Sequence, residues 1–354
     1  MWTTHTVLSL LVAVTLMTAL PGSAAAATSE EEVRYRSDVP LAAALLRPRG
    51  EGPWPAVVIV HGSGAVDRKQ AWARAIAELF VARGFAVLLP DKRGSGGSGG
   101  DWRLAGFEEL ADDAIAGVEA LKAKEDIDPR RIGVAGLSQG GWIVPLVAVR
   151  RPDVAFVVDL SGATVSLAEQ TYLEMGNTAR KAGLPEEGVR QVLALNRAAG
   201  RYLLGGAWDD YAAVRAAAMA GPAKPVAAGF PAERDAPIWT FLRKVGAWDP
   251  LPYWTAVEQP VFIGLGERDE EDNVPVAESV RRIEFAFSTA GKTNYDLVVA
   301  PAVGHALWNE KGEFAPLLLQ RLDDWLAKYG TRGAGATSST APGATLPAGS
   351  PPRS

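Results

Sequence analysis

The most informative stretch of this sequence reads Ile132-Gly133-Val134-Ala135-Gly136-Leu137-Ser138-Gln139-Gly140-Gly141-Trp142. Residues 132–137 form a short apolar run that predicts a buried strand, and residues 140–149 predict an apolar helix. Between them, residues 136–140 match G-x-S-x-G. A strand that runs straight into this pattern and a helix that runs straight out predict a serine on a strained turn, with its hydroxyl available as a nucleophile. The helix N-terminus behind the serine also favours developing negative charge. The alternative is a tight turn with an incidental serine.

The chain contains a second match to the same pattern, Gly96-Gly97-Ser98-Gly99-Gly100. No strand leads directly into it and no helix leads directly out, so we expect a loop. The overlapping run 94–99 also matches the dinucleotide fingerprint G-x-G-x-x-G, which should follow a strand closely and open a helix. Asp91, Lys92 and Arg93 intervene after the predicted strand. We therefore expect no bound cofactor.

Strands and helices alternate on both sides of the serine, which predicts a mostly parallel sheet with helices on both faces. We expect strands at 32–37, 39–47, 56–60, 85–89, 154–160, 261–265 and 295–299. Further helices are expected at 69–83, 107–124, 275–290 and 314–326.

The alternation stops between residues 163 and 257. This segment has helical patterns at 166–182, 186–204, 209–220 and 237–245, with no strand between them. We interpret it as a helical cap inserted into an α/β core made of residues 28–162 and 258–330. The cap is rich in aromatic residues, which either line a substrate pocket or pack the cap onto the sheet.

The two ends of the chain lie outside this core. Residues 1–27 combine an apolar run, Pro21 and small residues with A-x-A-type cleavage sites, which predicts a signal peptide. The run is shorter than the roughly 20 residues of a membrane span, although no Lys or Arg precedes it and an uncleaved anchor is the alternative. Residues 331–354 predict a disordered tail. We expect a secreted or periplasmic protein with no stable membrane insertion after cleavage.

Composition excludes several classes of function. The 354 residues carry a net charge of -5 with both signs interspersed, so a nucleic-acid partner is not expected. The absence of cysteine excludes disulfides, thiol catalysis and thiolate metal sites. We expect neither a metal nor a cofactor, and the oligomeric state stays open.

A serine nucleophile needs a general base, and the chain has three histidines. His5 lies in the predicted signal peptide. His61 directly follows a predicted strand, ahead of the serine. His305 follows the last predicted strand and is the candidate base.

A carboxylate should hold the base in the correct tautomer and stabilise its imidazolium. We expect it in the acidic loop 266–275, with Asp269 preferred over Asp272. The same loop could be a solvated surface loop, and it lacks the spacing of a calcium site. The stretch His61-Gly62-Ser63-Gly64 lies where an oxyanion-hole loop belongs. We expect the hole to use the backbone N–H groups of Ser63 and Gln139, with the side chain of His61 structural.

Together these residues resemble the α/β-hydrolase superfamily, and most of all bacterial serine aminopeptidase-like or dienelactone-hydrolase-like esterases. The matching pieces span most of residues 33–328 and are the runs 61–64, 91–94, 136–142, 249–250, 266–275 and 304–305.

The resemblance implies an α/β-hydrolase fold and an acyl-serine intermediate formed from an ester, thioester or amide. It also implies the chain order serine, acid, histidine, which His305 alone satisfies. Asp91 and Arg93 match a structural loop of the family. The acid loop departs from the family pattern, because Asp269 lies further from Val274-Pro275 than usual.

Three functions compete at this stage. The first is a carboxylic-ester hydrolase with the triad Ser138, Asp269 and His305. The second is an exopeptidase that uses the same triad on an amide and needs a carboxylate near the substrate amine. The cap offers Glu169, Glu174 and Glu186 for that role, although a solvated helix face is the expected place for each. The third is a non-catalytic binding protein, which would have lost the serine or the histidine.

Overall fold

Eight strands form one sheet in the order β1-β2-β4-β3-β5-β6-β7-β8, in a computed structural model that describes residues 29–330. The predicted signal peptide and tail lie outside the described residues. The pairs β1–β2 and β2–β4 are antiparallel and the other five pairs are parallel. The strands are β1 (Ser29–Arg36), β2 (Pro40–Arg47), β3 (Trp54–Val60), β4 (Ala86–Pro90), β5 (Ile127–Leu137), β6 (Val157–Leu160), β7 (Val261–Gly266) and β8 (Tyr295–Ala300).

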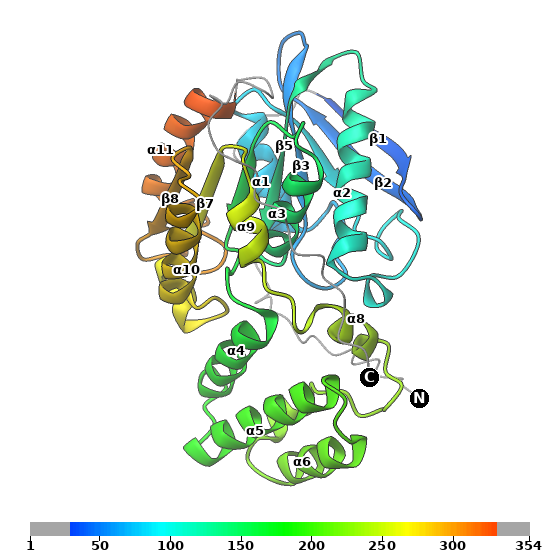
Figure 1. The fold of residues 1–354 in the computed structure, drawn as a ribbon, viewed down its shortest axis with the longest axis vertical. Coiled ribbons are helices and arrows are strands. Elements are labelled where there is room, and N and C mark those ends of the chain that lie inside the picture. Colours follow the sequence, from blue (N-terminus) through cyan, green and yellow to red (C-terminus); the bar gives the residue numbers. More distant parts are fainter. Residues whose placement is uncertain (1–28, 331–354) are drawn as a thin grey trace.

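Helices cover both faces of this sheet, as Figure 1 shows. Successive strand residues point to opposite faces, so Leu45 and Leu46 of β2 enter two separate apolar cores. One core packs against α1 (Ala71–Val81) and α11 (Pro316–Trp325), and the other against α2 (Phe107–Lys122), α3 (Gly140–Arg150) and α10 (Val276–Thr289). The predicted mostly parallel α/β sheet is therefore confirmed.

Strand β5 begins earlier than predicted. Trp54 of β3 pairs with Ile127 before a register shift, and the regular pairing of Ala56 with Ile132 follows. Residues 132–137 are all buried, because both faces of this central strand are covered. Their continuous apolar character predicted the buried part of β5, whereas the polar start of the strand carried no such signal.

The helices predicted between β6 and β7 are present as α4 (Leu167–Lys181), α5 (Glu186–Leu203), α6 (Trp208–Ala220) and α8 (Ile238–Val245). Two shorter helices, α7 (Lys224–Ala227) and α9 (Leu251–Ala256), were not predicted. In Figure 1, α4, α5 and α6 lie away from the sheet, whereas α9 packs back against α3 and α10. A capping box between Ser166 and Glu169 begins α4.

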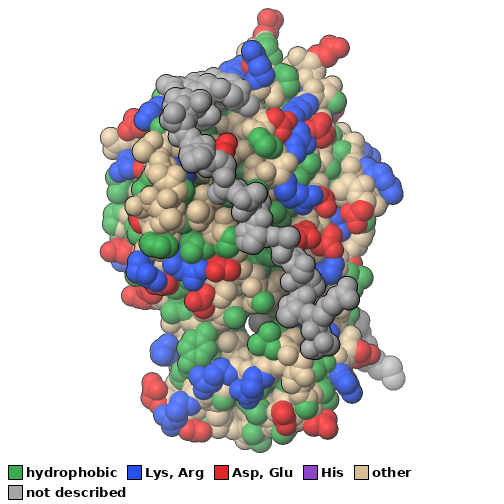
Figure 2. Space-filling view, viewed as in Figure 1, with side chains coloured by type: hydrophobic (Ala, Val, Ile, Leu, Met, Phe, Trp, Pro, Cys, Tyr) green, Lys and Arg blue, Asp and Glu red, His purple; other side chains and the backbone are tan. Residues whose placement is uncertain are grey.

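Charges of both signs are interspersed over the face shown in Figure 2. Within residues 29–330, no helix combines the length and apolar character needed to cross a membrane. The same residues contain no cluster of three or more His, Asp or Glu side chains suited to holding a metal ion.

Candidate active site

Ser138 occupies a sharp turn between β5 and α3. Its backbone φ of 53° lies in the left-handed region, which non-glycine residues rarely adopt. A Cβ on Gly136 would lie 2.6 Å from the Gly140 backbone, and one on Gly140 would lie 2.2 Å from the Val60 carbonyl oxygen. Both glycines are therefore needed for the close approach of strand and helix. The turn is the strained strand–turn–helix that the sequence motif predicts.

His305 and Asp269 meet at the carboxyl ends of β8 and β7. The Nδ1 atom of His305 lies 2.6 Å from Oδ2 of Asp269, whose side chain is fully buried. The other carboxylate oxygen of Asp269 accepts a hydrogen bond of 3.2 Å from the Asn273 backbone N–H. These contacts fix the orientation of the imidazole and direct Nε2 away from the acid.

Asp272, the second candidate for the acid, lies elsewhere. Its side chain is 44% exposed, and its Oδ1 accepts a hydrogen bond of 2.7 Å from Lys181 Nζ on α4. The lengthened acidic loop forms a short 3-10 turn over Glu267–Glu271, which buries Asp269 and leaves Asp272 at the surface. The geometry therefore favours Asp269 as the partner of His305.

The surroundings of His305 act on its pKa in opposite directions. Burial alone lowers the pKa, because the charged imidazolium is poorly solvated. The charge and hydrogen bond of Asp269 outweigh burial, with smaller contributions from the charges of Asp272 and Glu174. The net result is a pKa above the ordinary value of 6.5. A base with this shift is well matched to taking a proton from serine near neutral pH.

Backbone contacts bring the serine turn and the histidine loop together. The Ser138 N–H donates to the Leu160 carbonyl oxygen at 2.9 Å, and the next residue, Ser161, donates through Oγ to the His305 carbonyl oxygen at 2.7 Å. Nε2 of His305 is buried and has no hydrogen-bond partner among the described residues. This nitrogen is thus available for a proton, and hydrogen bonds of this kind often form only when substrate is bound.

The loop after β3 lies against the serine. A Cβ on Gly62 would come within 3.3 Å of the Ser138 Cβ. Within residues 29–330, neither the Ser63 N–H nor the Gln139 N–H donates to another backbone or side-chain acceptor. Gln139 directly precedes α3, where the first N–H groups of a helix lack intrahelical acceptors. The two predicted donors are therefore free to bind an oxyanion beside Ser138.

His61 lies behind this loop. Its Nε2 lies 2.5 Å from the Pro90 carbonyl oxygen, so this nitrogen carries the proton and donates. Burial lowers the pKa of His61 to about 4. The imidazole is thus neutral and ties the end of β3 to the end of β4, in keeping with a structural role.

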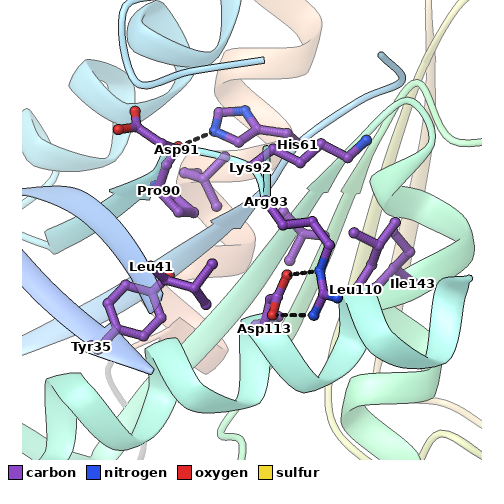
Figure 3. A pocket seen from close by; sticks show the side chains of 13 residues that line it. Tyr35, Leu41, His61, Pro90, Asp91, Lys92, Arg93, Leu110, Asp113 and Ile143 are labelled. Atoms are coloured by element: carbon purple, nitrogen blue, oxygen red, sulfur yellow. Dashed lines mark hydrogen bonds and ion pairs between the residues drawn. The ribbon is translucent and has the colours of Figure 1, made fainter. Parts of the chain in front are cut away.

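Two buried groups near the site carried no recognised signal in the sequence analysis. Lys92 lines a small cavity beneath the loop after β3 (Figure 3). Its Nζ donates to the Gly62 carbonyl oxygen and to Oε1 of Gln139. Asp159 of β6 is fully buried, and Gly141 and Gly162 pack against its carboxyl group. A run of charged residues after a strand, and an acid within an apolar strand, were the available hints.

The cap differs from its prediction at one acidic residue. Glu174 of α4 was expected on a solvated helix face but is buried, and its charge contributes to raising the pKa of His305. Glu169 and Glu186 are exposed, as expected. The cause is the position of α4, which directs one side toward the carboxyl edge of the sheet while the other faces solvent.

The aromatic residues of the cap pack partly on one another and partly on helices of the core. Tyr202, Trp208, Tyr211 and Trp239 form one group with ring centroids 5.0–6.4 Å apart. This group packs within the cap, whereas Trp248 and Trp254 contact Phe107 of α2 and Phe287 of α10. These two contacts pack the segment onto the core, which is the second of the two alternatives.

The sheet, the strained serine turn and the histidine–aspartate pair define a protein of the α/β-hydrolase fold. A similar fold is found in an esterase structure from Pyrococcus furiosus, with a TM-score of 0.54, 19% identity, and coverage of 85% of this chain and 91% of that one. The family model of the X-Pro dipeptidyl-peptidases (S15 family) matches residues 37–259, which is more than half of the chain. The chain belongs to this family.

Curated relatives match shorter stretches. The quorum-quenching protein AidA of Acinetobacter baumannii is 32% identical over 155 residues, which are 43% of this chain and 50% of that protein. Esterase EstD of Thermotoga maritima is 34% identical over 108 residues, which are 29% of this chain and 26% of that protein. The chain thus spans half or less of the length of these two relatives. The similarity to them covers only part of the fold.

Proposed function

We propose that this chain is a serine hydrolase that cleaves carboxylic esters through an acyl-enzyme on Ser138. The contact that carries the proposal is the hydrogen bond between His305 and the buried Asp269, beside a serine held in the left-handed region. The esterases among the similar proteins support the ester as substrate. We also propose, from the sequence of residues 1–27, that the protein is secreted or periplasmic.

The reaction follows from the geometry. Oγ of Ser138 attacks the ester carbonyl carbon while Nε2 of His305 takes the hydroxyl proton. The carbonyl oxygen becomes an oxyanion that accepts hydrogen bonds from the N–H groups of Ser63 and Gln139. Collapse of the tetrahedral intermediate breaks the bond to the alcohol, which leaves with the proton from His305. Water then attacks the acyl-serine with His305 again as base, and the carboxylic acid is released.

Labelling and turnover test this proposal on the purified full chain. A fluorophosphonate probe should label Ser138, and p-nitrophenyl esters from acetyl to palmitoyl should be cleaved, with the best acyl length describing the pocket. The Ser138→Ala variant should lose both signals. Ser98→Ala is the matched control, because it removes the same hydroxyl from the second G-x-S-x-G stretch. Absence of labelling in the parent protein would contradict the proposal and favour a non-catalytic binding protein.

A second candidate is an exopeptidase that uses the same residues. It is favoured by the buried Glu174, whose charge reaches His305, and by the peptidases of the matching family. A carboxylate in that place would attract the free amine of a peptide substrate. Alanine p-nitroanilide, compared with its N-acetylated form, tests this candidate. Preference for the free amine, lost in Glu174→Gln, would favour the exopeptidase over the esterase.

A further inference from the structure

Three consecutive charged residues follow β4, and they diverge in Figure 3. Asp91 pairs with Arg68 at 2.8 Å, and Arg93 pairs with Asp113 at 2.7 Å. Lys92 differs from both, because its Nζ has no carboxylate within ion-pair distance among the described residues. Its partners are neutral: the Gly62 carbonyl oxygen at 2.8 Å and Oε1 of Gln139 at 2.7 Å.

Burying such a cation is costly. A buried ammonium group without a counterion loses its hydration and regains only the hydrogen bonds it makes. Burial accordingly lowers the pKa of Lys92 to about 7. Placing Nζ 5.6 Å from the centre of the Trp102 ring compensates only in part. A residue kept at this cost calls for a reason beyond packing.

The partners of Lys92 supply that reason. The Gly62 carbonyl belongs to the same peptide group as the Ser63 N–H, and the two point in opposite directions in a trans peptide. Holding the carbonyl toward Nζ therefore turns the Ser63 N–H away from Lys92. The second contact holds the side chain of Gln139, whose own N–H is the other free donor beside Ser138. One ammonium group thus connects both halves of the oxyanion hole.

We propose that Lys92 is a positioning residue that locks the peptide of Ser63 and the residue Gln139 into one oxyanion-binding geometry. The proposal rests on the proposed function, since it concerns the same site. The oxyanion exists in the transition state and not in the bound substrate, so Lys92 stabilises the transition state and contributes little to substrate binding. The cost of removing it should thus fall on kcat with little change in KM.

Lys92→Met tests the proposal, because methionine retains the length of the chain without its donors. For the best p-nitrophenyl ester we expect kcat to fall about 100-fold, with KM changing less than about threefold. Affinity for an alkyl trifluoromethyl ketone should fall by a similar factor. Ser138 adds to the ketone carbon of this inhibitor, its proton passes to His305, and the resulting hemiketal oxyanion occupies the hole.

Lys292→Met is the matched control. Like Lys92, Lys292 donates through Nζ to two neutral oxygens, here the backbone carbonyls of Val257 at 3.0 Å and Gln259 at 2.6 Å. Lys292 lies just before β8, at the opposite end of that strand from His305. Loss of an amine that makes two hydrogen bonds should destabilise both variants, while only Lys92→Met should lose kcat and inhibitor affinity. Equal kinetic effects in the two variants, or a Lys92→Met enzyme with parental kcat, would overturn the proposal.

A further variant covers the case in which Lys92→Met does not fold. Gln139→Leu removes one of the two acceptors and retains Lys92, so kcat should fall about tenfold with KM preserved. An unchanged kcat in that variant would refute the proposal that Lys92 holds the two halves of the oxyanion hole together. Fluorophosphonate labelling of the parent separates the two levels: an unlabelled parent ends the proposed function and this inference together, whereas a labelled parent with insensitive variants ends only the inference.

Discussion

The two G-x-S-x-G stretches of this chain share a pattern and differ in almost every structural respect. Ser138 joins a buried strand to a helix and has a φ of 53°, whereas Ser98 lies in a loop with negative φ. The hydroxyl of Ser98 makes two hydrogen bonds: it donates to the Asp91 carbonyl oxygen at 2.7 Å and accepts from the Ala42 N–H at 2.9 Å. Within residues 29–330, the hydroxyl of Ser138 makes no such hydrogen bonds. The flanking strand and helix, and not the motif, hold the serine in the strained turn that the proposed nucleophile requires.

Each stretch also packs against a buried aspartate, and the two aspartates have opposite electrostatics. Asp91 is surrounded by Arg68 and the Gly97 N–H, and these hydrogen bonds outweigh burial, so its pKa lies below the ordinary value. Asp159 has no well-formed hydrogen-bond partner among the described residues, and burial raises its pKa to about 8. The ionised Asp91 therefore stabilises the glycine-rich loop through its hydrogen bonds. Asp159, beside the Ser138 turn, is instead uncharged near neutral pH.

Replacing each serine by alanine in a separate variant should give the largest difference in kcat between the two stretches. Ser138→Ala removes the nucleophile and should lower kcat for esters by about 10⁶-fold. Ser98→Ala removes only structural hydrogen bonds and should leave kcat within about twofold. Steady-state kinetics on the best p-nitrophenyl ester measures both. A large activity loss in Ser98→Ala would break the contrast between the two stretches.

Asp269→Asn should have the next largest effect, a loss of about 10⁴-fold in kcat, because the imidazole is then held in the wrong tautomer. The pH profile gives an independent reading. His305 must be neutral to accept a proton, so kcat/KM of the parent should rise with pH through an inflection above 6.5. Removing the charge of Asp269 removes the main cause of the raised pKa. The inflection of residual activity should therefore move down, and an unmoved inflection would argue against the pair.

Asp91→Asn should act on stability instead of chemistry. It leaves Arg68 partly buried without its main counterion, at an expected cost of about 3 kcal/mol in the free energy of unfolding at pH 7. Because the folded pKa of Asp91 is depressed, its contribution is present above the unfolded value near 3.8 and is lost as pH falls below it. Urea unfolding of parent and variant at pH 7 and pH 3 should show a difference that shrinks in acid.

Asp159→Asn should change the free energy of unfolding in the opposite direction and stabilise the protein. The folded state holds a proton on Asp159 up to about pH 8, while the unfolded chain releases it near pH 4, so stability of the parent should decline between these values. The variant removes this pH dependence and should be more stable than the parent at pH 8 by about 2 kcal/mol. The gain is smaller than the full pKa shift of Asp159 implies, because an amide is also costly to bury. Urea unfolding at pH 5 and pH 8 measures it. A parent with equal stability at both values would contradict the assignment.

The smallest effect is expected from the stability of Ser98→Ala. Losing the two hydrogen bonds of one hydroxyl should cost about 1 kcal/mol. Thermal melts of Ser98→Ala and Asp91→Asn, measured side by side, compare the stability losses that the two substitutions cause in the same loop. A cost equal to that of Asp91→Asn would mean that the hydroxyl, and not the carboxylate, organises the glycine-rich stretch.

Local pattern was sufficient for most elements of the fold and for several candidate residues of the site. A buried strand, a helix and a G-x-S-x-G between them follow from apolar periodicity and from the space that only glycine leaves, and these are properties of neighbouring residues. The small number of histidines and their order along the chain singled out His305. Asp269 could be favoured but not distinguished from Asp272, because both stand in the same acidic loop.

Contacts between distant segments carry the information that the local pattern lacks. Burial and the 2.6 Å contact with His305 separate Asp269 from Asp272, whose partner is Lys181 of the cap. The burial of Glu174 depends on the orientation of α4, and the role of Lys92 depends on two loops that are 30 and 47 residues away. Sequence pattern records which side chains a segment offers to its own turn or face. The charge, exposure and partners of a side chain depend on what the fold packs against it, and that information is distributed over the whole chain.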